Sequence, residues 1–168
     1  KNNNLTTQAQ ETIRAISETR AILATGHLSG DEVTVLVPEA IRQGVRAVVL
    51  THVSSRHNRL SVEIQAGLIS AGKKHGTPVF AEHCAITWFD GKAGAYDLQQ
   101  DFVLPMQAVG TENCIISSDS GRVIEPGRSV PTTPIDCLER FTGLLINKGL
   151  IETDIRKMVV DNPRNLLL

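Results

Sequence analysis

The chain has 168 residues, of which 41% are hydrophobic and 21% charged, a composition typical of a globular protein rather than of a disordered or fibrous one. Its 17 basic and 18 acidic residues are interspersed, so we expect no broad charged surface and no nucleic-acid partner. Because no apolar stretch approaches the roughly 20 residues of a membrane span, we expect no membrane partner and a cytoplasmic location.

Aliphatic runs that end in small polar residues alternate along the chain with stretches of helical period. In chain order we expect a helix at 7–19, a strand at 21–24, a helix from Ser29 to Gly44, a strand at 47–50, a helix at 61–75 and a strand at 78–81. There follow an irregular loop at 85–96, a helix at 98–109, a strand at 114–116, a helix at 135–148, and a helix at 153–160 that Asn162 and Pro163 interrupt. This alternation predicts an α/β fold with a parallel sheet, in one domain that spans 1–168.

The start of the second helix has a capping signature. Ser29 stands three residues before Glu32, which is the spacing of a capping box. We therefore expect the side chains of both residues to bind backbone N–H groups at this helix end.

The chain has three cysteines, Cys84, Cys114 and Cys137, without a Cys-x-x-Cys pair. An odd number at wide spacing argues against a disulfide framework and against a thiolate zinc site. We expect the cysteines to be reduced and mostly buried. Cys84 is singled out because it directly follows a histidine.

Each of the four predicted strands ends at or near a residue that can bind a metal ion or move a proton. Parallel strands present their carboxyl ends at the same edge of a sheet, so we expect these residues to converge. Imidazole and carboxylate groups suit zinc and similar ions, which lower the pKa of a bound water to about 7. We predict a divalent metal site, with zinc the favoured ion, and Asp119 as the base that takes the proton of the water. Its candidate ligands are His27, His52, His83 and Asp119.

Other roles remain open for part of this set. His27 stands beside Gly26 and before a capped helix, which also suits anion binding or loop stabilisation. Arg56 and Arg122 follow two of the candidate ligands and are candidates to clamp a substrate carboxylate or phosphate. The alternative for each arginine is an ordinary solvated charge.

The segments ATGHLSGDE, VVLTH, FAEHC, IISSDSGR and MVVDNPRNLLL resemble, in this order, the C-terminal half of amidohydrolase-like metal-dependent hydrolases, especially an uncharacterised cytosolic branch related to phosphotriesterase-type barrels. The resemblance implies that His52 and His83 are the metal-binding histidines of strands five and six and that Asp119 is the aspartate of strand eight. It implies about half of a TIM-like (β/α) barrel, and hydrolysis of a small amide, lactone or ester substrate by metal-bound hydroxide. The chain departs from the family in two ways: His27 stands where many relatives carry a bridging lysine or glutamate, and no His-x-His pair occurs.

Two alternatives to a hydrolase stay open. One is a metal-free, catalytically inert fragment or a small-ligand-binding α/β module. The other is a complete flavodoxin-like domain that binds a phosphorylated ligand, which is disfavoured because no glycine-rich phosphate loop follows the first strand. Since a closed barrel has eight strands and we predict four, we also expect either a missing N-terminal half or association with another copy of the chain.

Overall fold

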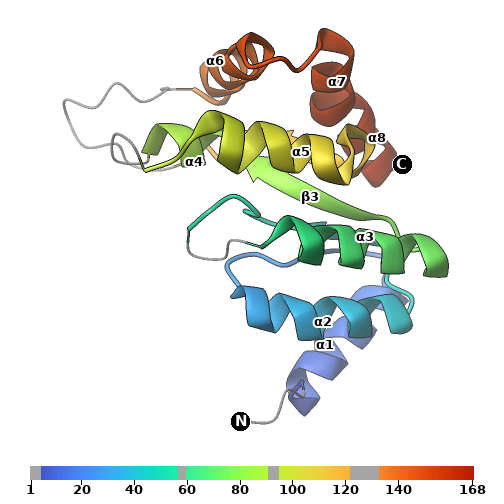
Figure 1. Ribbon diagram of the computed structural model, residues 1–168. Coiled ribbons are helices and arrows are strands. Elements are labelled where there is room, and N and C mark those ends of the chain that lie inside the picture. Colours follow the sequence, from blue (N-terminus) through green and yellow to red (C-terminus); the bar gives the residue numbers. More distant parts are fainter. Residues whose placement is uncertain (1–4, 57–59, 91–94, 122–132) are drawn as a thin grey trace. The chain divides into compact units, whose positions relative to one another are not determined.

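The computed structural model describes residues 5–56, 60–90, 95–121 and 133–168 (Figure 1). The chain divides into two units, Lys1–Ala81 and Glu82–Leu168, and each is described by itself. The strands form one sheet in the order β1-β2-β3-β4, and β3 runs from the first unit into the second. This confirms the α/β class with a parallel sheet that the sequence predicts. No helix in the described part of the chain has the length and apolar character that crossing a bilayer requires.

The first unit alternates helices and parallel strands. Leu23 pairs with Val48 between β1 and β2, and Val48 pairs with Val79 between β2 and β3, so both ladders are parallel. All residues of β2 are buried, as expected for a strand with a neighbour on each side. The elements of this unit are α1 (Thr7–Glu18), β1 (Ile22–Ala24), α2 (Gly30–Arg42), β2 (Ala47–Leu50), α3 (Val62–His75) and the first part of β3 (Val79–Cys84).

Helix ends in the first unit follow the local sequence signals. The backbone N–H of Ser29 donates to the Glu32 carboxylate at 2.8 Å, and the backbone N–H of Glu32 donates to the Ser29 hydroxyl at 3.3 Å, so the predicted capping box is confirmed. The Glu32 carboxylate accepts hydrogen bonds from both the backbone N–H and the hydroxyl of Ser29, and these two bonds lower the pKa of Glu32 because they stabilise its charged form. Helix α3 ends at Gly76 with φ of 74°, a left-handed conformation that glycine adopts without a steric cost.

Helices α2 and α3 lie side by side in this unit (Figure 1). Gly72 permits the close approach of α3 to the chain that follows it, because an added Cβ would collide with the carbonyl oxygen of Thr77 and the side chain of Val79. An added Cβ at Gly67, in the same helix, would meet nothing within 4 Å. The absence of a side chain therefore matters for packing at Gly72 and not at Gly67.

The second unit is built around an aromatic core. Phe102 and Phe141 are fully buried, and their rings meet edge to face with centroids 5.3 Å apart. The Trp88 ring also meets Phe102 edge to face, with centroids 6.4 Å apart. The elements are the end of β3, α4 (Ala85–Asp90), the π-helix η1 (Gln99–Val103), α5 (Leu104–Val109), the 3-10 turn η2 (Thr111–Asn113), β4 (Cys114–Ser117), α6 (Pro134–Asn147), α7 (Glu152–Arg156), the π-helix η3 (Lys157–Asp161) and α8 (Asn162–Leu167).

Three expectations about this unit are wrong. The predicted loop at 85–96 begins with helix α4, because Ala85, Ile86 and Trp88 pack into the core. The third strand does not end at Ala81 but continues through His83 to Cys84.

The third wrong expectation concerns the last helix, which is not broken at Asn162 and Pro163. The chain passes through the π-helix η3 and continues as α8, with the proline in its first turn, where a missing N–H costs little. The Asn162 side chain is buried and donates to the carbonyl oxygens of Thr111 and Cys114 at 2.9 and 2.7 Å. Tertiary hydrogen bonds from Asn162 therefore stabilise the helical conformation at a point where local sequence rules predict a break.

Candidate functional site

Among the described residues, three of the four strands are followed by the same kind of turn. A hydroxyl residue comes directly after the strand, and the next residue has a left-handed backbone. Non-glycine residues seldom adopt this conformation, although aspartate and histidine do so more readily than most. Among the described non-glycine residues, Arg20 is the only other one with positive φ. The three turn residues are Gly26 (φ 58°) after β1, His52 (φ 58°) after β2 and Asp119 (φ 50°) after β4.

In the first unit, the turns after β1 and β2 bring two predicted site residues together. The rings of His27 and His52 are stacked, with centroids 4.9 Å apart and an angle of 8° between their planes. The two turns are also joined through their threonines, because the backbone N–H of Thr51 donates to Thr25 Oγ1 at 2.9 Å. His52 is buried and His27 is exposed, so the pair extends from the protein interior to the surface.

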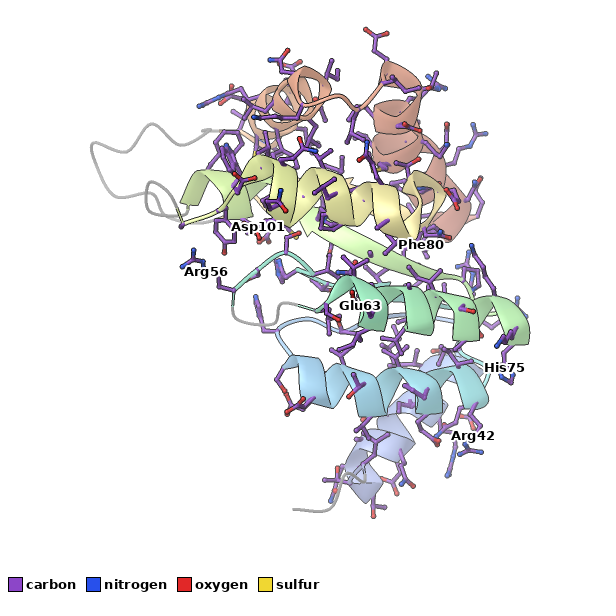
Figure 2. The ribbon with its side chains drawn as sticks, in the orientation of Figure 1. Arg42, Arg56, Glu63, His75, Phe80 and Asp101 are labelled. Carbon is purple, nitrogen blue, oxygen red and sulfur yellow. The ribbon has the colours of Figure 1, made fainter. Side chains whose placement is uncertain are left out.

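The two predicted substrate-binding arginines have different outcomes. Arg56 lies in the loop after β2 and is exposed, and Figure 2 shows its side chain directed away from the ribbon. Arg122 lies outside the described residues. An exposed guanidinium can take up a carboxylate or phosphate, so Arg56 remains a candidate for substrate binding.

In the second unit, His83 lies inside β3 and not in a loop after it. Its side chain is completely buried, and its ring centroid lies 6.2 Å from that of Phe102. Burial lowers the pKa of His83 to about 3, since the interior disfavours the charged imidazolium. His83 is therefore a neutral imidazole within the aromatic core near neutral pH.

Cys84 has a different environment from its neighbour His83. Its sulfur accepts a hydrogen bond from the Ser117 hydroxyl at 3.4 Å. The same sulfur and a carboxylate oxygen of Asp119 lie within 4.8 Å of one another. Cys84 is buried and Asp119 is exposed, and a sulfur and a carboxylate oxygen are both ligand atoms that zinc accepts.

Backbone contacts fix the turn that carries Asp119. The carbonyl oxygen of Ser118 accepts a hydrogen bond from the backbone N–H of Ile86 at 3.1 Å, and the Cys137 thiol lies 3.8 Å from it. These contacts tie the end of β4 to the starts of α4 and α6. The backbone that precedes Asp119 is thus held by contacts with two other elements of the second unit.

Sequence reasoning missed Cys84 as a candidate ligand. The absence of a Cys-x-x-Cys pair argues against a thiolate zinc site, so the sequence singles out Cys84 only for its place beside His83. A signal was present in the strand pattern, since adjacent residues of a strand point to opposite faces. Because His83 faces the aromatic core around Phe102, its neighbour Cys84 faces the opposite side of β3. All three cysteines are buried, as expected, and carry thiols rather than disulfides.

Comparison with known proteins gave a match for only part of the chain. Residues 1–74 match a family of unknown function, DUF6282. The matched segment contains His27, His52 and Arg56, and it ends before His83, Cys84 and Asp119. No curated protein and no solved structure matches the chain.

Proposed function

We propose that the chain is part of a metal-dependent hydrolase with a TIM-like barrel, which acts on a small amide, lactone or ester and uses zinc. The observation that carries the proposal is the left-handed turn that presents His52 after β2 and Asp119 after β4. A strained backbone costs on the order of 1–3 kcal/mol and is concentrated at functional sites, where the side chain has a task. Both residues are of types that bind zinc.

The short distance between Asp119 and Cys84 supports the same proposal. A carboxylate and a sulfur within 4.8 Å are suitable donors for a zinc ion, and the ion would supply an activated water at neutral pH. With such an ion bound, the exposed carboxylate of Asp119 would take a proton from that water and return it to the leaving group. An exposed guanidinium such as Arg56 suits a substrate that carries a carboxylate.

Metal content and hydrolysis test the proposal together. The purified chain is dialysed against zinc, freed of loose metal and analysed by mass spectrometry for bound ions. It is then assayed on a panel of small esters, lactones and amides, with and without a chelator. We expect stoichiometric zinc, and hydrolysis that the chelator removes and added zinc restores. A folded chain that retains no metal and hydrolyses no member of the panel would instead support the metal-free ligand-binding module.

A further inference from the structure

We infer that Cys84, and not its neighbour His83, is the metal ligand that β3 provides, and that its thiolate makes the site selective for zinc over magnesium and calcium. The inference rests on the proposed function, because it assumes that a metal ion is bound. It assigns a ligand that the resemblance to the amidohydrolase-like family does not imply, since that resemblance gives this role to His83.

The position of His83 argues against a role as ligand. Its ring lies 6.2 Å from Phe102, which is itself fully buried and in contact with other aromatic rings. Those rings belong to Trp88, Tyr96 and Phe141, at centroid distances of 6.4, 6.0 and 5.3 Å from Phe102. A metal ion on this face of β3 would have to be desolvated inside an aromatic layer, which is energetically costly. His83 is therefore better explained as a residue of the core.

The side chain of Cys84 lies on the face of β3 opposite to that of His83. Adjacent residues of a strand point to opposite faces, so the sulfur of Cys84 leaves the strand away from the aromatic layer. There it meets the Ser117 hydroxyl at 3.4 Å and lies within 4.8 Å of the Asp119 carboxylate. Zinc binds sulfur at about 2.3 Å and carboxylate oxygen at about 2.0–2.2 Å. A small movement of the exposed Asp119 side chain would therefore let both atoms bind one ion.

The Ser117 hydroxyl gives the sulfur a fixed partner. A hydrogen bond donated to a thiolate stabilises the charged form and orients the ligand, which is the usual task of groups around a metal site. Ser117 is the last residue of β4, so the strand itself positions this donor. The arrangement has a soft sulfur and a hard oxygen, which suits zinc or cobalt, whereas magnesium and calcium prefer oxygen ligands alone.

Cobalt(II) is the probe that tests the inference, because a thiolate bound to cobalt gives an intense charge-transfer absorption that imidazole and carboxylate ligands do not give. The whole chain is titrated with cobalt, and absorption and binding affinity are recorded. The variants are Cys84→Ser and, as matched controls, Cys137→Ser and Cys114→Ser, which remove the other two buried thiols. We expect the band in the wild type and in both controls. Cys84→Ser should lose it and bind cobalt at least about tenfold more weakly, the loss that even outer groups of a metal site cause.

The outcomes separate this inference from the proposed function. Cobalt binding without the charge-transfer band in the wild type would overturn the role of Cys84 and leave a metal-dependent hydrolase possible. A band without hydrolysis of any substrate would support the Cys84 ligand and count against the hydrolase. No cobalt binding at all would overturn both. If Cys84→Ser does not fold, the Cys114→Ser/Cys137→Ser double variant provides the test, because Cys84 is then the only thiol of the chain. The charge-transfer band should persist in this double variant, and its loss would overturn the role of Cys84.

Discussion

The imidazole rings of His27 and His52 are nearly parallel with centroids 4.9 Å apart, although the two residues are 25 positions apart in the sequence. Each ring follows a strand of the first unit, and the two strands are neighbours in register. The stack therefore results from parallel strand pairing, which brings equivalent turns to the same edge of the sheet.

The stacked rings predict that His27 contributes to packing. Two substitutions distinguish this role from a role in ligand binding. His27→Ala should lower the free energy of unfolding by about 0.5–1.5 kcal/mol, the range of an aromatic pair. His27→Phe retains a flat ring but no metal-binding nitrogen, so it should recover most of that stability. Urea denaturation measures both variants. Equal stability of His27→Ala and wild type would show that the stack contributes nothing to folding.

Asp119→Asn should reduce turnover of any substrate of the proposed hydrolase by at least about 100-fold, because the change removes the proton acceptor and leaves the shape of the side chain. The fold should be retained, since asparagine also tolerates the left-handed backbone at φ of 50°. The measurements are a rate and a melting curve on the same preparation. A folded variant with unchanged turnover would exclude Asp119 from the reaction.

Two glycines of α3 form a matched pair for a packing prediction. Gly72→Ala should destabilise the protein by about 1–3 kcal/mol, because the new methyl group collides with the Thr77 carbonyl and Val79. Gly67→Ala should leave stability unchanged or raise it by up to about 1 kcal/mol, since alanine favours the helix and its Cβ meets nothing. Thermal unfolding of the two variants checks the difference. Similar melting temperatures would mean that α3 does not approach β3 as described.

Stability should depend on pH through His83. Its pKa falls from 6.5 to about 3 on folding, so below pH 6.5 the unfolded chain binds a proton that the folded chain does not. The free energy of unfolding should therefore be insensitive to this group above pH 6.5 and should decrease by up to about 1.4 kcal/mol per pH unit below it, until about pH 3.

Urea denaturation at several pH values measures this slope, with His83→Leu as the comparison. Just below pH 6.5, the free energy of unfolding of this variant should depend on pH much less than that of the wild type. Carboxylates remain ionised in this range, so they do not contribute to the slope. An unchanged slope in a folded His83→Leu protein would contradict the assignment of His83 to a buried, neutral state.

Local signals were sufficient for most of the secondary structure. The capping box of Ser29 and Glu32 and the left-handed Gly76 act within one turn of a helix, so the helix ends could be predicted without knowledge of the fold. Helix α4 was missed because its apolar residues fit several periodicities, and packing against Phe102 selects the helix. The π-helices η1 and η3 lie outside what local rules describe.

The sequence by itself determined that polar residues with metal-binding groups follow the strands, because the end of an aliphatic run is a local feature of the chain. Only the tertiary structure decided which of two adjacent residues, His83 or Cys84, faces the aromatic core and which lies near Asp119. The physical reason is that a strand extends as far as hydrogen bonding to its neighbours carries it, and here it continues past Ala81 to Cys84. The direction of each side chain follows from that extension, which depends on residues distant in the sequence.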